Sequence, residues 1–237
     1  MRIAVIGGSG RIGSRIVGEA RSREHEVTAV VRDRSRIDPG AGGDGRISVA
    51  SADAFEPAAV AAAVADADVV VSAVGHAASL DDQSFYVRAA KSLVEALRSL
   101  GGEGKRLIAV GGFGSLEVSP GVQFADRSTL PDKAAPEIKG QRDALSYYRS
   151  VQDVCWTYVS PPPGGIRPGE RTGSYRLTRD GVFEGEPRES LISMEDFAVA
   201  VVDEAERGEH PLTCIAIASQ GPYSRRPVSS GPAPRPR

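Results

Sequence analysis

Short apolar runs alternate along this chain with segments in which apolar residues recur every three or four positions. The first run, residues 2–6, is almost continuously apolar, as expected of a strand buried on both faces. Similar runs predict six further strands, at residues 27–31, 46–50, 68–74, 106–110, 154–159 and 213–218. Helical spacing predicts helices that follow residue 13 and that cover about 57–64, 82–100, 134–150 and 193–207. This alternation is typical of α/β proteins with a parallel sheet.

Other segments depart from the alternation. Residues 111–131 read as a long loop rich in Gly and Pro, of the kind that binds ligands. Residues 160–165 leave the sheet sharply, and residues 173–185 are compatible with one or two short strands. From residue 221 onward Gly, Pro, Ser and Arg predict a disordered tail. We therefore expect one domain over residues 1–220, whose small C-terminal elements (about 160–218) lie on the substrate side.

A glycine-rich turn joins the first strand to the first helix. Its sequence is Gly7-Gly8-Ser9-Gly10-Arg11-Ile12-Gly13. The glycines fit two registers, Gly8-x-Gly10-x-x-Gly13 and the wider Gly7-x-x-Gly10-x-x-Gly13, and both allow backbone N–H groups to approach a pyrophosphate. A tight turn that binds nothing is the alternative, but three spaced glycines exceed what a turn requires. We predict that these seven residues bind a dinucleotide.

The end of the second predicted strand indicates which dinucleotide. Arg32 stands where an NAD enzyme carries an acid for the ribose hydroxyls, so its guanidinium is suited to the 2′-phosphate of NADP. Arg11 is placed to approach the same phosphate from the other side. Asp33, one residue further on, would favour NAD instead. We expect NADP(H) as the preferred cofactor and leave NAD(H) as the alternative.

Composition and charge restrict the class of protein. The chain has 237 residues, 41% hydrophobic and 25% charged, which is ordinary for a soluble globular protein. Its net charge of −2 gives no basic surplus for nucleic acid or an anionic membrane, and no apolar run reaches the ~18 residues of a membrane span. We expect a cytoplasmic monomer or homodimer acting on a small molecule. Cys155 and Cys214 lack the spacing of a metal site, so no metal is expected.

Several motifs resemble one known family. They are the glycine-rich turn, the strand end Val31-Arg32-Asp33 and Ser72-Ala73-Val74-Gly75, with residues 110–118, 156–161 and 168–173. The chain resembles the NmrA-like, NAD(P)H-binding branch of the atypical short-chain dehydrogenase/reductases. It is similar to a bacterial subgroup of NAD(P)H-dependent oxidoreductases whose relatives include flavin and biliverdin reductases. The resemblance covers residues 1 to about 218.

The resemblance implies a Rossmann-like, doubly wound parallel sheet with strand order 3-2-1-4-5-6-7 and helices on both faces. It implies that Asp53 lies near the adenine. It also implies that the loop of Ala73, Val74, Gly75 and His76 lies along the cofactor. We place Gly111 and Gly112, which follow the fifth strand, among the cofactor-binding residues as well.

The chain departs from the wider superfamily in its catalytic residues. Typical members protonate a carbonyl with a Tyr assisted by a Lys four residues later. Here Tyr147 and Tyr148 precede Val151 and Gln152 at that spacing, and Tyr86 precedes Ala90. The position after the fifth strand, which is often a catalytic Ser, holds glycine. A mechanism based on a Tyr–Lys pair is therefore not supported.

Three residues compete as proton donors or substrate contacts. Lys139 opens the helix that follows the long loop, where related proteins often carry Lys; a surface Lys is the alternative. His76 follows the fourth strand, beside the expected nicotinamide, and a solvated loop His is its alternative. Ser115 could bind a substrate oxygen or simply close a turn.

These observations favour an NADPH-dependent oxidoreductase that passes a hydride to a small aromatic, quinonoid or flavin-like acceptor. Hydride transfer requires only a well-positioned nicotinamide, and the acceptor can take its proton from solvent. We expect pocket walls from Phe113, Phe124, Tyr158 and residues 161–165, at the carboxyl ends of the strands. The alternatives are a non-enzymatic NADP(H)-sensing regulator and an epimerase or dehydratase with tightly bound nucleotide.

Overall fold

The computed structural model describes residues 1–37, 45–75, 82–101, 104–126, 132, 134–181 and 190–220. Within them the main sheet has eight strands in the order β10-β12-β8-β5-β4-β1-β2-β3. Its strands are β1 (Arg2–Ile6), β2 (Glu26–Val31), β3 (Ile47–Ser51), β4 (Val69–Ser72), β5 (Arg106–Val110), β8 (Cys155–Ser160), β10 (Tyr175–Arg179) and β12 (Thr213–Ser219).

The predicted fold class and strand order are confirmed. Seven strands pair in parallel in the predicted sequence 3-2-1-4-5-6-7. The eighth strand, β10, comes from the segment 173–185 and pairs antiparallel with β12, Tyr175 opposite Ser219. Because all seven parallel strands end at the same edge, their carboxyl ends form one continuous rim on which a ligand can lie.

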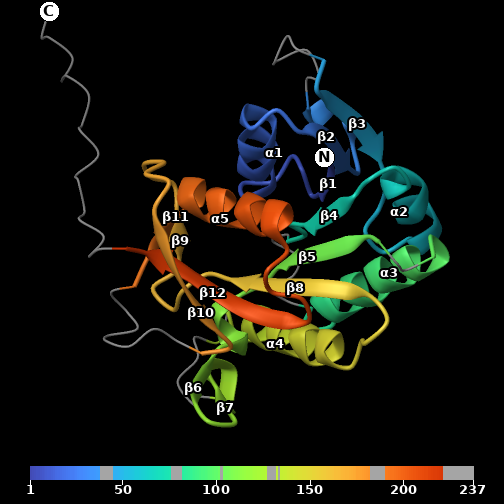
Figure 1. Cartoon of the computed structure of the whole chain (residues 1–237). Coiled ribbons are helices and arrows are strands. Elements are labelled where there is room, and N and C mark those ends of the chain that lie inside the picture. The colour runs from blue at the N-terminus through green and yellow to red at the C-terminus, as the bar shows by residue number, and fades with distance from the viewer. Residues whose placement is uncertain are drawn as a thin grey trace, which may run out of the picture.

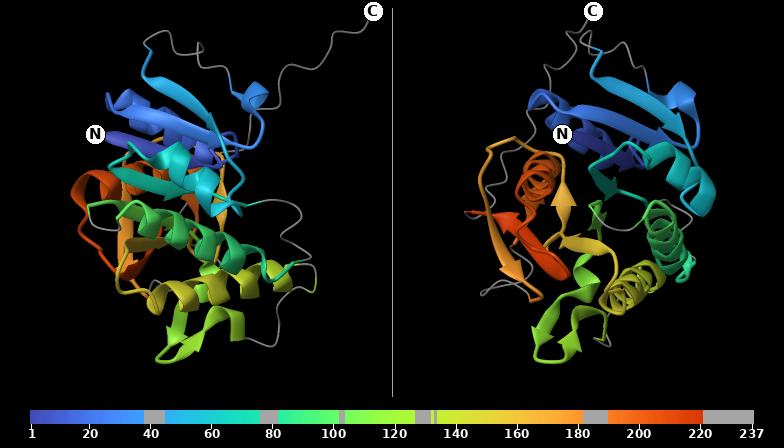
Figure 2. Two further views of the ribbon diagram at one scale, coloured as in Figure 1. Left: turned by 90° about the vertical axis from the view of Figure 1, so that its right-hand side faces the viewer. Right: turned by 45° about the vertical axis from the view of Figure 1, so that its right-hand side comes forward.

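Helices cover both faces of the sheet (Figures 1 and 2). Helices α1 (Gly13–Ser22) and α5 (Met194–Arg207) pack on one face, where Ile16 and Phe197 are completely buried. Helices α2 (Pro57–Val64), α3 (Phe85–Ser99) and α4 (Ala135–Arg149) pack on the other, around Leu93 and Trp156. Ser193 caps α5 as predicted, since its hydroxyl accepts the N–H of Asp196 at 2.9 Å.

An ionic network joins α1 to α5. Arg23 of α1 donates to Glu19 at 2.8 Å, to Asp203 of α5 at 2.6 Å and to Glu206 at 2.9 Å. Arg171 closes the network on the second oxygen of Glu19 at 2.7 Å. The network fixes the helix whose N-terminus carries the glycine-rich turn.

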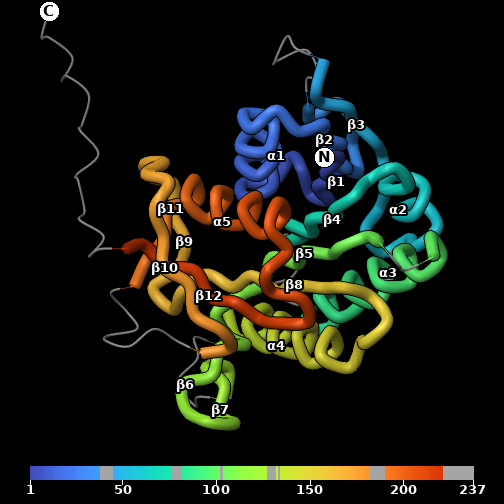
Figure 3. The backbone as a smooth tube through the Cα atoms, in the orientation of Figure 1, coloured from blue at the N-terminus to red at the C-terminus, as the bar shows by residue number. Residues whose placement is uncertain are grey.

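Several short elements lie outside the main sheet (Figure 3). The segment expected to be a plain loop contains the turn η3 (Phe113–Ser115), the hairpin β6 (Glu117–Ser119) and β7 (Val122–Gln123), and the turn η4 (Phe124–Asp126). A second small sheet pairs β9 (Ile166–Arg167) with β11 (Ile192–Ser193). The prediction of a plain loop was wrong for these residues, because strands of two or three residues leave no periodic pattern. The predicted disordered tail, 221–237, lies outside the described residues.

Candidate functional site

The glycine-rich turn is held in one conformation by contacts among its own glycines. Gly7 has φ +82° and its N–H donates to Val30 O at 2.9 Å, while Gly10 N–H donates to Gly7 O at 2.9 Å. A Cβ on Gly13 would lie 2.1 Å from Gly7 O. Gly10 and Gly13 therefore both pack against Gly7, and the Cβ on Gly13 would also lie 3.2 Å from Gly8 Cα. Gly8 packs on its other side against Ala29 of β2, 3.0 Å from a Cβ built on it.

The N-terminus of α1 is open toward a ligand. Its N-cap is Ile12, no side chain caps the helix, and no acidic residue lies in its first turn. The N–H groups of Ser14 and Arg15 already donate to Gly10 O at 2.9 Å and to Ile12 O at 3.0 Å, but the positive end of the helix dipole still faces an anion placed against the turn. This arrangement fits the pyrophosphate of a dinucleotide, held by the backbone of the turn.

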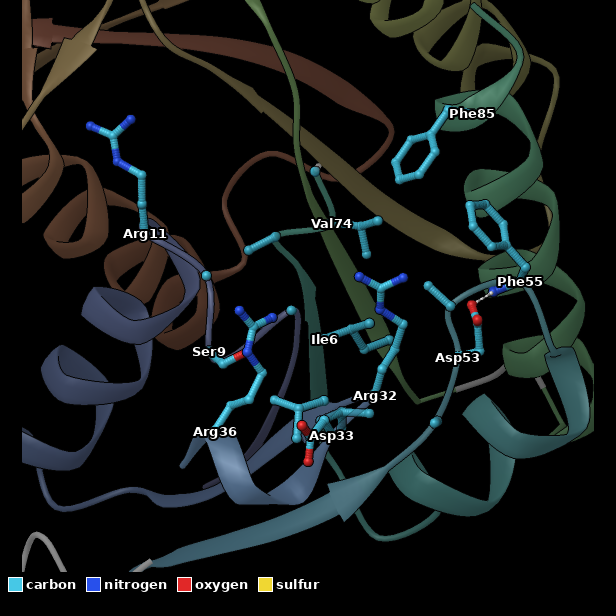
Figure 4. Close-up of a pocket in the computed structure, with 18 residues that line it drawn as sticks. Ile6, Ser9, Arg11, Arg32, Asp33, Arg36, Asp53, Phe55, Val74 and Phe85 are labelled. Carbon is cyan, nitrogen blue, oxygen red and sulfur yellow. Dashed lines mark hydrogen bonds between the residues drawn. The ribbon is translucent and has the colours of Figure 1, made fainter. Parts of the chain in front are cut away.

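A cavity of about 670 Å³ adjoins the turn at the ends of β1, β2 and β4. Most of the predicted cofactor-binding residues line it: Gly7, Ser9, Gly10, Arg11, Arg32, Asp53, Ala73, Val74 and Gly75. Figure 4 shows Arg32 extending into this space between Val74 and Asp53. Asp53 Oδ1 accepts the N–H of Phe55 at 3.0 Å, which fixes the loop that carries both residues. This cavity has the position expected for the adenosine half of the cofactor.

A further arginine after β2, Arg36, lines this cavity together with Arg32 and Arg11. Arg36 belongs to the short helix η1 (Arg34–Arg36) and points toward Ser9, whereas Arg11 points away from both arginines (Figure 4). Arg11 nevertheless lines the same cavity, so its approach to the phosphate stays a prediction. In the sequence Arg36 stands four residues after Arg32. This spacing alone did not identify it, because Arg36 reaches the cavity only when residues 34–36 form the short helix η1.

Asp33 lies between these arginines but has a different role. Its Oδ1 accepts the hydroxyl of Ser35 at 2.7 Å and the backbone N–H of Ser35 at 3.0 Å. The Ser35 hydroxyl, the Ser35 N–H and the nearby charge of Arg36 hold the pKa of the Asp33 carboxyl below its usual value. Asp33 is thus the N-cap of η1.

A second cavity, of about 540 Å³, continues the first along the rim of the sheet. Five residues border both cavities: Gly10, Arg11, Ala73, Val74 and Gly75. Consecutive residues of α3 divide between them, Phe85 lining the first and Tyr86 the second. Together the cavities form a groove that crosses the N-terminus of α1, as an extended dinucleotide requires.

Gly111 and Gly112 lie in the second cavity, and their lack of side chains has a local cause. A Cβ on Gly111 would stand 1.9 Å from the ring of Tyr158, and one on Gly112 would stand 1.5 Å from Gln141 Oε1. Tyr158 is 2% exposed and donates its hydroxyl hydrogen to the carbonyl of Gln141 at 2.9 Å. At Gly111 there is therefore no room for the Ser that often follows the fifth strand, because the Tyr158 ring occupies the space of its side chain.

A hydrogen-bonded pair that sequence reasoning missed also faces the second cavity. The hydroxyl of Tyr86 on α3 donates to Oε1 of Glu137 on α4 at 2.9 Å, and both residues line the cavity. The pairing joins residues 51 positions apart. Local spacing therefore gave no signal for it, and the search for a basic partner of Tyr86 considered only position 90.

Of the three predicted catalytic residues the structure describes Lys139 and Ser115, and neither lines the second cavity. The residues of α4 that line the cavity include Glu137, Ile138 and Gln141, and Lys139 lies roughly 100° further round the helix from Ile138, outside the lining. Ser115 is completely buried and donates its hydroxyl to Gly112 O at 2.8 Å, which is the turn-closing alternative. His76 lies outside the described residues.

The predicted pocket walls are present in part. Phe113, Pro161 and Gly165 line the second cavity. Phe124 lies behind Phe113, with ring centroids 5.0 Å apart in an edge-to-face contact, and Tyr158 is buried under Gly111. Parallel sheet, open helix N-terminus and continuous groove together define a Rossmann-type dinucleotide-binding protein.

Comparison with known proteins identifies the family. A family model described as NAD(P)H-binding matches residues 7–207. The chain is 32% identical over 222 residues to YwnB, an uncharacterized protein of Bacillus subtilis (strain 168), covering 93% of this chain and 99% of YwnB. The chain therefore belongs to the NAD(P)H-binding family, which confirms the resemblance seen in its motifs.

Two solved structures agree closely in fold. A Burkholderia pseudomallei protein described as a candidate exported protein is 42% identical, with TM-score 0.80, covering 92% of this chain and 99% of that one. A Streptococcus pneumoniae protein described as a candidate NADH-flavin reductase is 31% identical, with TM-score 0.79, covering 93% of this chain and 100% of that one. Together with the groove, membership of this family identifies the chain as an NAD(P)H-dependent oxidoreductase. None of the helices in the described part of the chain is both long and apolar enough to span a bilayer.

Proposed function

We propose that the protein is an NADPH-dependent reductase of a small, planar, aromatic, quinonoid or flavin-like acceptor. The observation that carries this proposal is the division of the groove. Its first cavity holds two arginines near the end of β2, and its second is lined largely by apolar side chains and glycine backbone. The first suits the phosphorylated ribose of NADPH, and the second suits a nicotinamide with a flat acceptor against it.

The preference for NADPH rests on Arg32 and Arg36. Guanidinium groups bind phosphate through paired, charge-assisted hydrogen bonds, and both side chains line the first cavity. The acid that would select NAD, Asp33, already accepts two hydrogen bonds from Ser35. These arrangements support the 2′-phosphate as the ligand of this end of the groove.

The acceptor class rests on the walls of the second cavity. Its apolar side chains include Ile12, Val74, Val110, Phe113, Ile138, Pro161 and Ile166. A reduced nicotinamide bound there supplies a hydride, that is, one proton with two electrons, and the acceptor takes its second proton from solvent. The chain's own contribution is to orient the two rings and to exclude water around them. The epimerase or dehydratase alternative leans on a Tyr–Lys pair, and no Tyr of this chain has a Lys four residues later, which weighs against that alternative.

The test is a screen of purified protein and NADPH against flavins, quinones and enones. We expect NADPH consumption with at least one planar acceptor, dependent on the protein. In Arg32→Ala the KM for NADPH should rise while kcat at saturating NADPH is kept. Tight NADPH binding with no consumption on any acceptor would contradict the reductase proposal and favour the sensing regulator.

We place this activity in the cytoplasm. Both cysteines of the chain are free thiols, and Cys214 is buried. Unpaired thiols of this kind are usual in reducing compartments. Fractionation of cells expressing the full chain tests this placement, and recovery from the medium or periplasm would contradict it.

A further inference from the structure

The Tyr86–Glu137 pair places a fixed carboxylate in the second cavity. Tyr86 is 8% exposed, and its ring packs edge-on against Phe85 at 5.2 Å between centroids. Its hydroxyl lies beside Gly75, 3.5 Å from a Cβ built on that residue. Since the hydroxyl donates to Oε1 of Glu137, the carboxylate is oriented, and its other oxygen, Oε2, accepts no hydrogen bond from the described residues.

Glu137 stands at a position suited to an acidic side chain. It lies in the first turn of α4, where the helix dipole stabilises a negative charge. Among the described residues that line this cavity it is the only acid, and the only basic side chain, Arg11, stands at the junction with the first cavity. The acceptor end of the groove is therefore apolar apart from this carboxylate and neighbouring hydrogen-bonding groups.

A carboxylate in such a cavity discriminates among flat acceptors. When a ligand displaces water from it, the charge is destabilised unless the ligand donates a hydrogen bond. A quinone offers only acceptor oxygens at its edge, which repel the carboxylate oxygen. An anionic ring is disfavoured for the same reason. A neutral ring with an N–H at its edge satisfies the carboxylate.

Gln141 extends the same recognition surface. It lies one helical turn after Glu137 on the face of α4 that lines the cavity, and its amide lies over Gly112. An amide supplies both a donor and an acceptor. Glu137 and Gln141 side by side thus complement an edge that presents an N–H next to a C=O.

We propose that Glu137 is the acceptor-recognising residue, that Tyr86 is its positioning residue, and that the acceptor is a neutral ring with an imide-type N–H, of the isoalloxazine class. This inference rests on the proposed reductase function and selects, within its acceptors, flavin-like rings over quinones. Glu137 accepts the ring N–H through Oε2, and Gln141 donates to the neighbouring carbonyl.

The experiment compares riboflavin with N3-methylriboflavin, in which a methyl group replaces the imide hydrogen. Binding of each to protein saturated with NADP⁺ is measured by quenching of flavin fluorescence, so that no turnover is needed. Binding of NADP⁺ is measured first, by calorimetry, in every variant. The variants are Glu137→Ala, Glu137→Gln and Tyr86→Phe, with Glu95→Ala, an exposed acid on α3, as the control for loss of one negative charge.

We expect the wild-type protein and Glu95→Ala to bind riboflavin at least tenfold more tightly than the N3-methyl compound. Glu137→Ala should bind the two flavins equally, Glu137→Gln should keep part of the preference through its amide oxygen, and Tyr86→Phe should reduce the preference without changing NADP⁺ affinity. Equal binding of both flavins by the wild type overturns the inference. So does a preference that survives in Glu137→Ala, or intact NADP⁺ binding with no binding of either flavin. Absence of NADP⁺ binding instead overturns the proposed function, and the inference with it.

Discussion

Asp33 and Ser35 form a closed turn at the end of β2, in which Asp33 Oδ1 accepts both the hydroxyl and the N–H of Ser35, at 2.7 and 3.0 Å. The turn starts η1, and η1 brings Arg36 to the cavity that Arg32 already lines. The residue that made the sequence ambiguous between NAD and NADP therefore serves to position the second arginine. Both observations point toward a phosphate ligand at this end of the groove.

Replacing Asp33 by Asn tests this role. Because Asn caps helices about as well as Asp, the turn should persist, and NADH affinity should change by less than about twofold. Equilibrium titration with NADH, followed by intrinsic or nicotinamide fluorescence, measures this. A tenfold loss of NADH affinity would show that Asp33 contacts the ribose.

The glycine-rich turn gives a matched pair of substitutions on one helix. In Gly13→Ala the new Cβ would meet Gly7 O at 2.1 Å, so the turn must shift; we expect cofactor binding to fall by at least tenfold and thermal stability to drop. Gly18, also on α1, has no atom within 4 Å of a built Cβ, so Gly18→Ala should raise the free energy of unfolding by about 0.5–1 kcal/mol. Calorimetry of both variants with and without NADP⁺ measures these effects. Unchanged binding in Gly13→Ala would contradict the assignment of this turn to the cofactor.

The strand order and the cofactor end of the groove were predictable because their signals are local. A buried parallel strand is a continuous apolar run, and the turn from Gly7 to Gly13 has a fixed spacing. The sequence indicated a strand within residues 173–185, which is β10, but not its antiparallel pairing with β12, because that pairing depends on tertiary packing. The Tyr86–Glu137 contact was missed for the same reason: it exists only because α3 packs against α4. The role of Lys139 stays a prediction; the sequence could not show that it lies outside the cavity lining, because this depends on which side of α4 faces the cavity.

The network between α1 and α5 should contribute measurably to stability. Arg23 is 20% exposed, and its partners Glu19 and Asp203 are 6% and 14% exposed, so Arg23→Ala leaves two largely buried carboxylates without this partner. We expect a loss of about 3 kcal/mol in the free energy of unfolding by urea. Arg98→Ala, which breaks a pair with Asp153 that is 46% and 57% exposed, should cost less than about 1 kcal/mol. Equal losses of unfolding free energy in Arg23→Ala and Arg98→Ala would contradict the stabilising role assigned to the network.

The same network predicts how the stability of the protein changes at acidic pH. The hydrogen bond from Arg171 lowers the pKa of Glu19, and a further hydrogen bond from Arg23 adds to this effect. Burial raises the pKa, but the net result lies below the ordinary 4.5. Burial opposes ionisation of Asp203, but hydrogen bonds from Tyr175 and Arg23 lower its pKa below 3.8. A carboxyl group whose pKa is lower in the folded than in the unfolded protein stabilises the fold at pH values above its ordinary pKa. This stabilisation is lost as the pH falls through the folded-state pKa. Stability should therefore fall below about pH 4.5, and less steeply in Arg23→Ala; an identical slope in the variant would contradict this.

The most direct test of the central claim is an equilibrium titration of the wild-type protein, Arg32→Ala and Arg36→Ala with NADPH and with NADH. Each lost phosphate contact should weaken NADPH binding roughly tenfold or more, equivalent to about 1.5–3 kcal/mol, because the contact is charge-assisted. NADH binding should stay within about twofold in both variants, because NADH lacks the 2′-phosphate. Equal affinities of the wild type for NADPH and NADH, unaffected by either substitution, would contradict the account.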